Sequence, residues 1–197
     1  MCEPIRNFGI TGFSVYQAFL RMKKEETRTP AKYIIFNIYE DDHYRNLISW
    51  TNISAGDVPG ARAGLSYPTA PHVKVNPSTG EFVEFGNPCP TRQSVYDLCD
   101  PSWVHETFKD DFVWKIVLAR KGIMENTPEK NYVEIMDLAH QHGMEVHIDS
   151  SETLRRTVET LHTRAGLFAT MRIIDKMEEF AAAHEKKVLY PYFPFEK

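Results

Sequence analysis

The sequence predicts an α/β domain built on a parallel sheet, and three observations carry that prediction. Residues 32–39, KYIIFNIY, are mostly aromatic or β-branched, as in a strand that is covered on both faces. A short strand candidate at residues 5–8 precedes it, and Val15, Phe19 and Met22 between the two lie at helical spacing. A strand, a helix and a strand in this order predict a right-handed parallel βαβ unit.

A turn-rich region follows this unit. Residues 73–85 alternate in polarity on either side of Asn76–Gly80, which predicts a β-hairpin with a loop of about five residues. We interpret residues from about 50 to 128 as an insertion, because the region is too short and too rich in turn residues to bury a core of its own. The sequence therefore predicts a single domain over residues 1–197.

Helical periodicity dominates the C-terminal half. An apolar ridge with i+4 spacing predicts a helix from residue 101 to about residue 122, and residues 131–142 predict a second helix. A long helix is expected over residues 149–184, weakly interrupted by Gly166 at a cost of about 1 kcal/mol relative to alanine. Residues 186–193, KKVLYPYF, predict a last strand.

Composition and charge narrow the classes of function. The net charge of −4 gives no reason to expect nucleic acid or an anionic membrane as a partner. No apolar run is long enough to predict a membrane span, no cofactor motif is present, and the first residues lack the regions of a signal peptide, so the compartment stays open. Cys2, Cys89 and Cys99 have no CxxC spacing; we interpret them as reduced thiols, with a Cys89–Cys99 disulfide as the alternative.

Two candidate site segments follow the predicted strands at 5–8 and 32–39. Asn7–Gly12 is a turn that opens a helix, where a glycine lets a backbone N–H approach a developing oxyanion. Residues 39–46, YEDDHYRN, crowd carboxylates around a histidine and an arginine. Ligands of open parallel sheets bind outside the carboxyl ends of the strands, so we expect both segments to face one crevice. A plain βα turn and a solvated loop with an ion pair at Arg45 are the structural alternatives.

Other patterns have simpler structural explanations. His140, His142 and His147 suggest a metal site, but two histidines two residues apart on a helix point about 200° from each other and cannot share one ion unless the helix ends between them. Residues 12–14, Gly-Phe-Ser, form a partial nucleophile elbow that lacks its second glycine. Residues 147–154, HIDSSETL, resemble a strand followed by a nucleophilic serine, but a capping box of Asp149 with Glu152 explains them more simply.

Together, RNFGITGFSVYQAFLRM and TPAKYIIFNIYEDDHYRNL resemble the SGNH/GDSL hydrolase superfamily, and look closest to its larger bacterial members with a hairpin and helical insertion. The resemblance rests on motifs over residues 5–47 and on element order over residues 90–190. It implies a flavodoxin-like, three-layer fold and an esterase or acyltransferase acting on a small ester or acylated molecule. It places the oxyanion-hole glycine at Gly12, and Asp41 at the position of the family's oxyanion asparagine.

Three features of the sequence depart from the pattern of this family. No Gly-Asp-Ser motif precedes residue 7, no Asp-x-x-His motif follows residues 186–193, and an ionised Asp41 can only accept hydrogen bonds. We therefore expect an incomplete flavodoxin-like core, truncated at both ends, with ordinary catalysis absent or very weak. In the remaining mechanism, a histidine or a carboxylate activates water and a backbone N–H steadies the oxyanion. The expected catalytic residues are Gly12, Asp41, Asp42 and His43, and the expected substrate contacts are Ser14, Arg45 and Asn46; no metal is expected.

Partners and an alternative function complete the prediction. In a flavodoxin-like order the absent strand is central, so unpaired edges beside residues 32–39 predict a homodimer or a higher oligomer. A non-catalytic binding or assembly module stays open as the alternative, using the aromatic residues of the hairpin region. A metal-dependent hydrolase built on the acidic loop and His43 lacks a second ligand cluster. The aromatic residues concerned are Tyr67, Phe82, Phe85, Tyr96 and Trp103.

Overall fold

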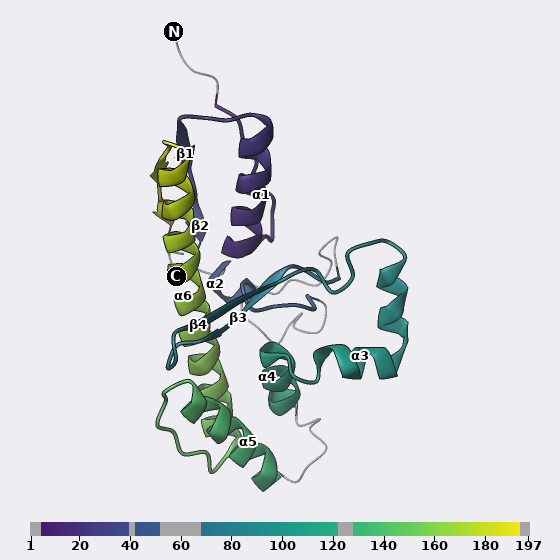
Figure 1. Ribbon diagram of the computed structural model, residues 1–197. Helices are drawn as coiled ribbons and strands as arrows, with labels where there is room; N and C mark the ends of the chain where they lie inside the picture. The colour runs from purple at the N-terminus through teal and green to yellow at the C-terminus, as the bar shows by residue number, and fades with distance from the viewer. Residues whose placement is uncertain (1–4, 40–41, 52–67, 122–127, 194–197) are drawn as a thin grey trace.

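The computed structural model describes residues 5–39, 42–51, 68–121 and 128–193, and these form a mixed α/β structure. It contains a small parallel sheet, an antiparallel hairpin and several helices (Figure 1). In chain order the elements are α1 (Val15–Arg28), β1 (Tyr33–Ile35), β2 (Ile38–Tyr39), α2 (Asp42–Arg45), β3 (His72–Asn76), β4 (Glu81–Phe85), the 3₁₀ helix η1 (Ser94–Cys99), α3 (Pro101–Phe108), α4 (Phe112–Lys121), α5 (Pro128–Gln141), α6 (Ser151–Ala183), β5 (Lys187–Leu189) and β6 (Tyr192–Phe193).

The parallel pairing joins the two ends of the chain. β1 pairs with β5, with Ile34 opposite Val188, and β2 pairs with β6. The last strand expected at residues 186–193 is therefore confirmed in part, since the segment forms two short strands, β5 and β6. The predicted βαβ unit is wrong, because residues 5–8 form no strand and Ile5 is 90% exposed. The strong strand takes its partner from a segment more than 150 residues away, not from the segment just before α1.

The strand that was expected to be covered on both faces buries one face. Ile34, Phe36 and Ile38 are buried in the core. Tyr33 and Ile35, which alternate with them along the chain, are exposed. Leu189 lies opposite Ile35 in the sheet and is 58% exposed. The outer face of this parallel sheet is thus apolar and uncovered in the chain as described.

α6 is the element around which the other described elements are arranged. It has 33 residues and spans roughly 50 Å. α1 and the parallel sheet lie along its C-terminal half, the hairpin crosses its middle, and α4 and α5 lie near its N-terminal half (Figure 1). One buried stripe serves two apolar clusters, the first with Ala165, Ala169, Ile173 and Met177 and the second with Leu154, Val158 and Leu161. The long predicted helix is confirmed.

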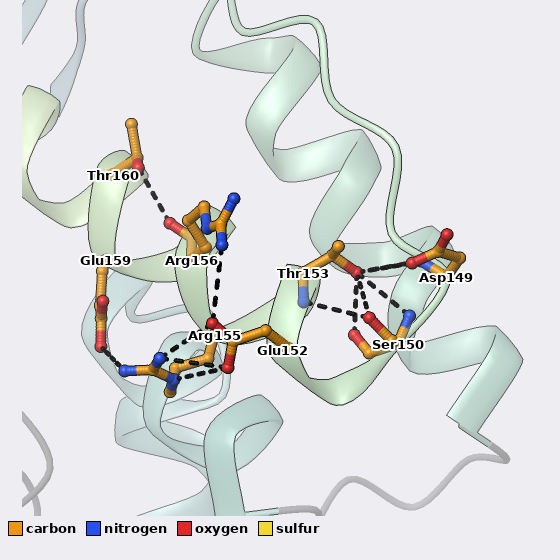
Figure 2. A network of polar contacts seen from close by, with 8 residues as sticks. All are labelled: Asp149, Ser150, Glu152, Thr153, Arg155, Arg156, Glu159 and Thr160. Atoms are coloured by element: carbon orange, nitrogen blue, oxygen red, sulfur yellow. Dashed lines mark hydrogen bonds and ion pairs between the residues drawn. The ribbon is translucent and has the colours of Figure 1, made fainter.

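The N-terminus of α6 is capped one residue later than expected. Ser150 is the N-cap: its Oγ accepts from the Thr153 N–H at 3.3 Å, and the Ser150 N–H donates to Thr153 Oγ1 at 3.1 Å. The predicted box of Asp149 with Glu152 is therefore wrong by one position. Glu152 instead bonds Arg155 at 3.0 Å on the helix surface (Figure 2). The serine of this segment serves the helix end, which agrees with its structural explanation.

The region between residues 68 and 121 departs from the predictions in detail. The hairpin is confirmed, but Asn76 pairs with Glu81, so its loop has four residues, with Gly80 at a φ of 76°. The single helix predicted from residue 101 to about residue 122 is wrong: α3 ends at Phe108 and α4 begins at Phe112. Asp111 causes the restart, because its Oδ1 accepts from the Trp114 N–H at 2.9 Å. The second predicted helix is confirmed as α5.

Candidate functional site

The short helix α2 rests on α6 at Gly166. A Cβ atom at Gly166 would lie 2.8 Å from the carbonyl oxygen of His43 and 3.1 Å from its carbonyl carbon. Only glycine leaves room for this approach of two backbones. His162, on the same helix, adds a contact between its Nε2 and the Tyr44 carbonyl oxygen at 3.1 Å. This packing places the side chain of His43 against α6.

A buried set of polar groups lies where α1, α2 and α6 meet; we call it the α2 polar cluster. It consists of His43, Asn46, Thr170 and the backbone N–H of Tyr16. His43 Nδ1 lies 2.7 Å from Thr170 Oγ1, and Asn46 Nδ2 donates to the same oxygen at 2.9 Å. Asn46 Oδ1 accepts from the Tyr16 N–H at 2.9 Å. Asn46 is fully buried and the other side chains are nearly so, so each of these hydrogen bonds is made away from bulk water.

A pocket of about 320 Å³ lies beside the α2 polar cluster, between α6 and the strand segments around Ile38 and Tyr190. Its volume is at the lower end of the range for small-molecule sites. Most of its wall is apolar, and His43 and Thr170 contribute polar groups at one place. The pocket is lined by Ile38, His43, Leu167, Thr170, Met171, Ile174, Tyr190 and Pro191.

The side chains of Asp42 and Arg45 form an ion pair. Arg45 Nη1 donates to Asp42 Oδ1 at 2.6 Å, and the Tyr39 N–H donates to Asp42 Oδ2 at 3.2 Å. Both side chains of the ion pair are mostly buried, and neither lines the pocket. An ion pair at Arg45 was part of the structural alternative to a functional site in this segment. Asp41 lies outside the described residues.

Gly12 and Ser14 lie at the start of α1. Gly12 adopts a left-handed conformation, with a φ of 84°, in the turn that precedes the helix. Ser14 is 1% exposed and forms a capping box with Gln17: its Oγ accepts from the Gln17 N–H at 3.1 Å, and its own N–H donates to Gln17 Oε1 at 2.8 Å. Neither residue lines the pocket. Among the predicted site residues that the structure describes, His43 is the one in the pocket wall.

Sequence reasoning missed Thr170 and Tyr190. Thr170 is separated from His43 by 127 positions, so no local motif joins them. One signal was available: Thr170 and His162, like Thr157, are polar residues on a mostly apolar buried stripe of α6. Buried polar side chains on such a stripe need a partner, and the partners of Thr170 and His162 lie on α2 or directly after it.

Two other histidines, His142 and His162, are buried and do not line the pocket. The pKa of His162 is lowered to about 4, mainly by burial and to a smaller extent by Arg120, although the hydrogen bond to the Tyr44 carbonyl acts in the opposite direction. Burial also lowers the pKa of His142, which packs against Phe112, and Arg164 acts in the same direction. His140 is half-exposed and lies 3.9 Å from Glu145. Among the described residues, no group of three or more histidine, cysteine, aspartate or glutamate side chains is arranged to hold a metal ion.

Neither the cysteines nor the aromatic residues of the hairpin region that the structure describes line the pocket. Cys89 is buried, Cys99 is exposed and both are free thiols, so the alternative disulfide between them is wrong. Of the aromatic residues considered for a binding module, Phe85 and Tyr96 are 42% and 69% exposed, whereas Phe82 packs against the core. Tyr67 lies outside the described residues.

Comparison with known proteins assigns the chain to no family: no family model, curated protein or solved structure matches it. In the part of the chain that the structure describes, no helix combines the length and the apolar character that crossing a bilayer requires.

Proposed function

We propose that this chain binds the acyl group of a small ester or other acylated molecule in the pocket beside His43, and hydrolyses the ester slowly. One observation carries the proposal: His43, singled out at the carboxyl end of the strong strand, lies in the wall of a mostly apolar pocket at hydrogen-bond distance from Thr170. Apolar walls take up an acyl chain by the hydrophobic effect. The imidazole then meets the carbonyl end of the ligand.

The choice of an ester rests on the resemblance to SGNH/GDSL hydrolases, and a flavodoxin-like core belongs to the same proposal. Its support is the parallel pairing of β1 with β5 and the position of α2 after β2 in the chain. This sequence contains no Gly-Asp-Ser, so the proposal supplies no serine nucleophile. Attack by water on a bound ester is expected to be slow for that reason.

A series of chromogenic p-nitrophenyl esters, from acetate to hexanoate, tests the proposal. His43→Gln is expected to lower kcat/KM at least tenfold, because it removes the group that meets the carbonyl. Met171→Trp fills the mouth of the pocket and is expected to raise KM for the longer esters. Val133→Trp is the matched control, since Val133 is a half-exposed helical residue on α5 that does not line the pocket. Equal rates in all four proteins would reject hydrolysis at this site.

Binding without turnover is the second candidate, favoured by the exposed Phe85 and Tyr96. Phe85 stacks on His72 at 5.2 Å between ring centroids, which holds an aromatic surface on the hairpin. A thermal-shift screen of glycans and peptides tests this candidate. Stabilisation that disappears in Phe85→Ser, and that is unchanged in His43→Gln, would assign binding to the hairpin instead of the pocket.

Self-association belongs to the same proposal. Parallel sheets are almost always covered on both faces, and the outer face here presents Ile35 and Leu189 side by side. A second copy covering this face would bury them. Light scattering after size-exclusion chromatography is expected to give a multiple of 22.8 kDa, reduced to one copy by Leu189→Asp. A monomer of the wild-type chain at micromolar concentration would reject this part of the proposal.

A further inference from the structure

The hydrogen bonds of the α2 polar cluster have a direction that can be read from one end. A backbone N–H can only donate, so the Asn46 atom that faces the Tyr16 N–H at 2.9 Å is the amide oxygen. The amide nitrogen of Asn46 must then face Thr170, where it donates to Oγ1 at 2.9 Å. One lone pair of the Thr170 hydroxyl is used in this way.

The proton of the Thr170 hydroxyl still needs an acceptor, because Thr170 is 3% exposed. Asn46 Nδ2 is a donor and cannot take it. Among the residues that the structure describes, the acceptor within hydrogen-bond distance of Thr170 Oγ1 is His43 Nδ1, at 2.7 Å. The opposite assignment, with Nδ1–H donating to Thr170, would leave the hydroxyl proton buried without an acceptor.

We infer that the backbone of α1, acting through Asn46 and Thr170, fixes His43 as the tautomer that carries its proton on Nε2, so that Nε2 acts as a hydrogen-bond donor toward the group it contacts. Asn46 and Thr170 are positioning residues, since they act through His43. This replaces the sequence-based hypothesis that His43 takes a proton from water.

The inference also specifies the ligand atom, and in this clause it rests on the proposed function. A donor imidazole polarises a carbonyl group or stabilises the oxyanion formed from it. The ligand atom at His43 is then an acceptor, such as an ester or ketone carbonyl oxygen. The apolar remainder of the pocket takes the alkyl chain of that molecule.

Nitrogen-15 NMR of the histidine side chains at neutral pH tests the tautomer without any need for turnover. Wild-type His43 is expected to carry its proton on Nε2 in about tenfold or greater excess. Thr170→Ser keeps the hydroxyl and is expected to keep this tautomer. A wild-type His43 that carries its proton on Nδ1, or that populates both tautomers equally, would overturn the inference.

Asn46→Asp reverses the relay in a side chain of the same shape. The new carboxylate accepts both from the Tyr16 N–H and from the Thr170 hydroxyl, so Thr170 must accept from His43 and the His43 proton moves to Nδ1. An unchanged Nε2–H tautomer in this variant would contradict the relay. If the buried carboxylate prevents folding, the wild type and Thr170→Ser decide the question alone. The exposed His105 is the internal control in every spectrum.

Addition of 2-heptanone to the same sample separates this inference from the proposed function. A saturable shift of the His43 Nε2–H signal supports both. An Nε2–H tautomer with no response to the ketone rejects the acyl pocket and leaves the tautomer standing. An Nδ1–H tautomer overturns the inference even where the ketone binds.

Discussion

Replacing Gly166 with alanine adds one methyl group where α2 rests on α6. The new Cβ would lie 2.8 Å from the His43 carbonyl oxygen, 3.1 Å from its carbonyl carbon and 3.5 Å from the Tyr44 nitrogen. All three are backbone atoms, so no side-chain rotation relieves the contact. α2 must move away from α6, and the 2.7 Å contact between His43 and Thr170 must lengthen.

Three terms set the size of the effect, one stabilising and two destabilising. Alanine is favoured over glycine inside a helix by about 1 kcal/mol. Overpacking costs about 1–3 kcal/mol, and a weakened buried hydrogen bond adds about 1–3 kcal/mol. We expect a net loss of about 2 kcal/mol in the free energy of unfolding, which corresponds to a fall in Tm of roughly 4–8 °C for a domain of this size.

Urea and thermal unfolding of Gly166→Ala measure this loss. Gly86→Ala is the matched control, because nothing lies within 4 Å of a Cβ atom there, and a change within about 0.5 kcal/mol is expected. A Gly166→Ala protein as stable as the wild type, or more stable, would refute the reasoning. Helix propensity alone predicts that stabilisation, so the two explanations differ in sign.

Three further predictions concern pH, a buried ion pair and a helix cap. The pKa of His162 is about 4 when folded and near 6.5 when unfolded, so the unfolded chain binds a proton that the folded chain refuses. The contribution of His162 to the free energy of unfolding is constant above pH 6.5 and falls by about 3 kcal/mol as the pH drops to about 4. Urea midpoints measured across this pH range should show this loss in the wild type and not in His162→Gln. Lys186→Met leaves the Glu26 carboxylate, which is 9% exposed, without its ammonium partner. This variant should lose about 3–5 kcal/mol of unfolding free energy, measured with urea, and adding Glu26→Leu should recover most of the loss. Ser14→Ala should lower the unfolding free energy by about 1 kcal/mol and leave ester turnover unchanged, whereas lost turnover in a folded variant would make Ser14 a reacting group.

Local patterns predicted the elements whose information lies within one or two turns of chain. The apolar stripe of α1, the alternation of the hairpin and the long stripe of α6 each record which side of an element is buried. The partner of the strand at residues 33–39 is not recorded in this way. Its hydrogen bonds go to residues 187–193, and periodicity says that a strand is buried without saying against what.

The site shows the same division between local and distant information. His43 was predicted because it follows a strong strand, but Thr170, which orients it, lies far along the chain. Gly166 was interpreted as a weak point of a helix, whereas in the structure it is the position at which the backbone of α2 packs against α6. Ser14 illustrates the limit of short motifs, because a helix cap and a partial nucleophile elbow have the same local sequence.

The measurement closest to the central claim is a titration of the wild-type protein with 2-heptanone, followed through the side-chain N–H signals of its histidines. The account predicts that the His43 Nε2–H signal shifts and saturates, that Met171→Trp weakens this response, and that exposed His105 does not respond. A His43 signal that stays unchanged up to the solubility limit of the ketone would contradict a ligand pocket at His43.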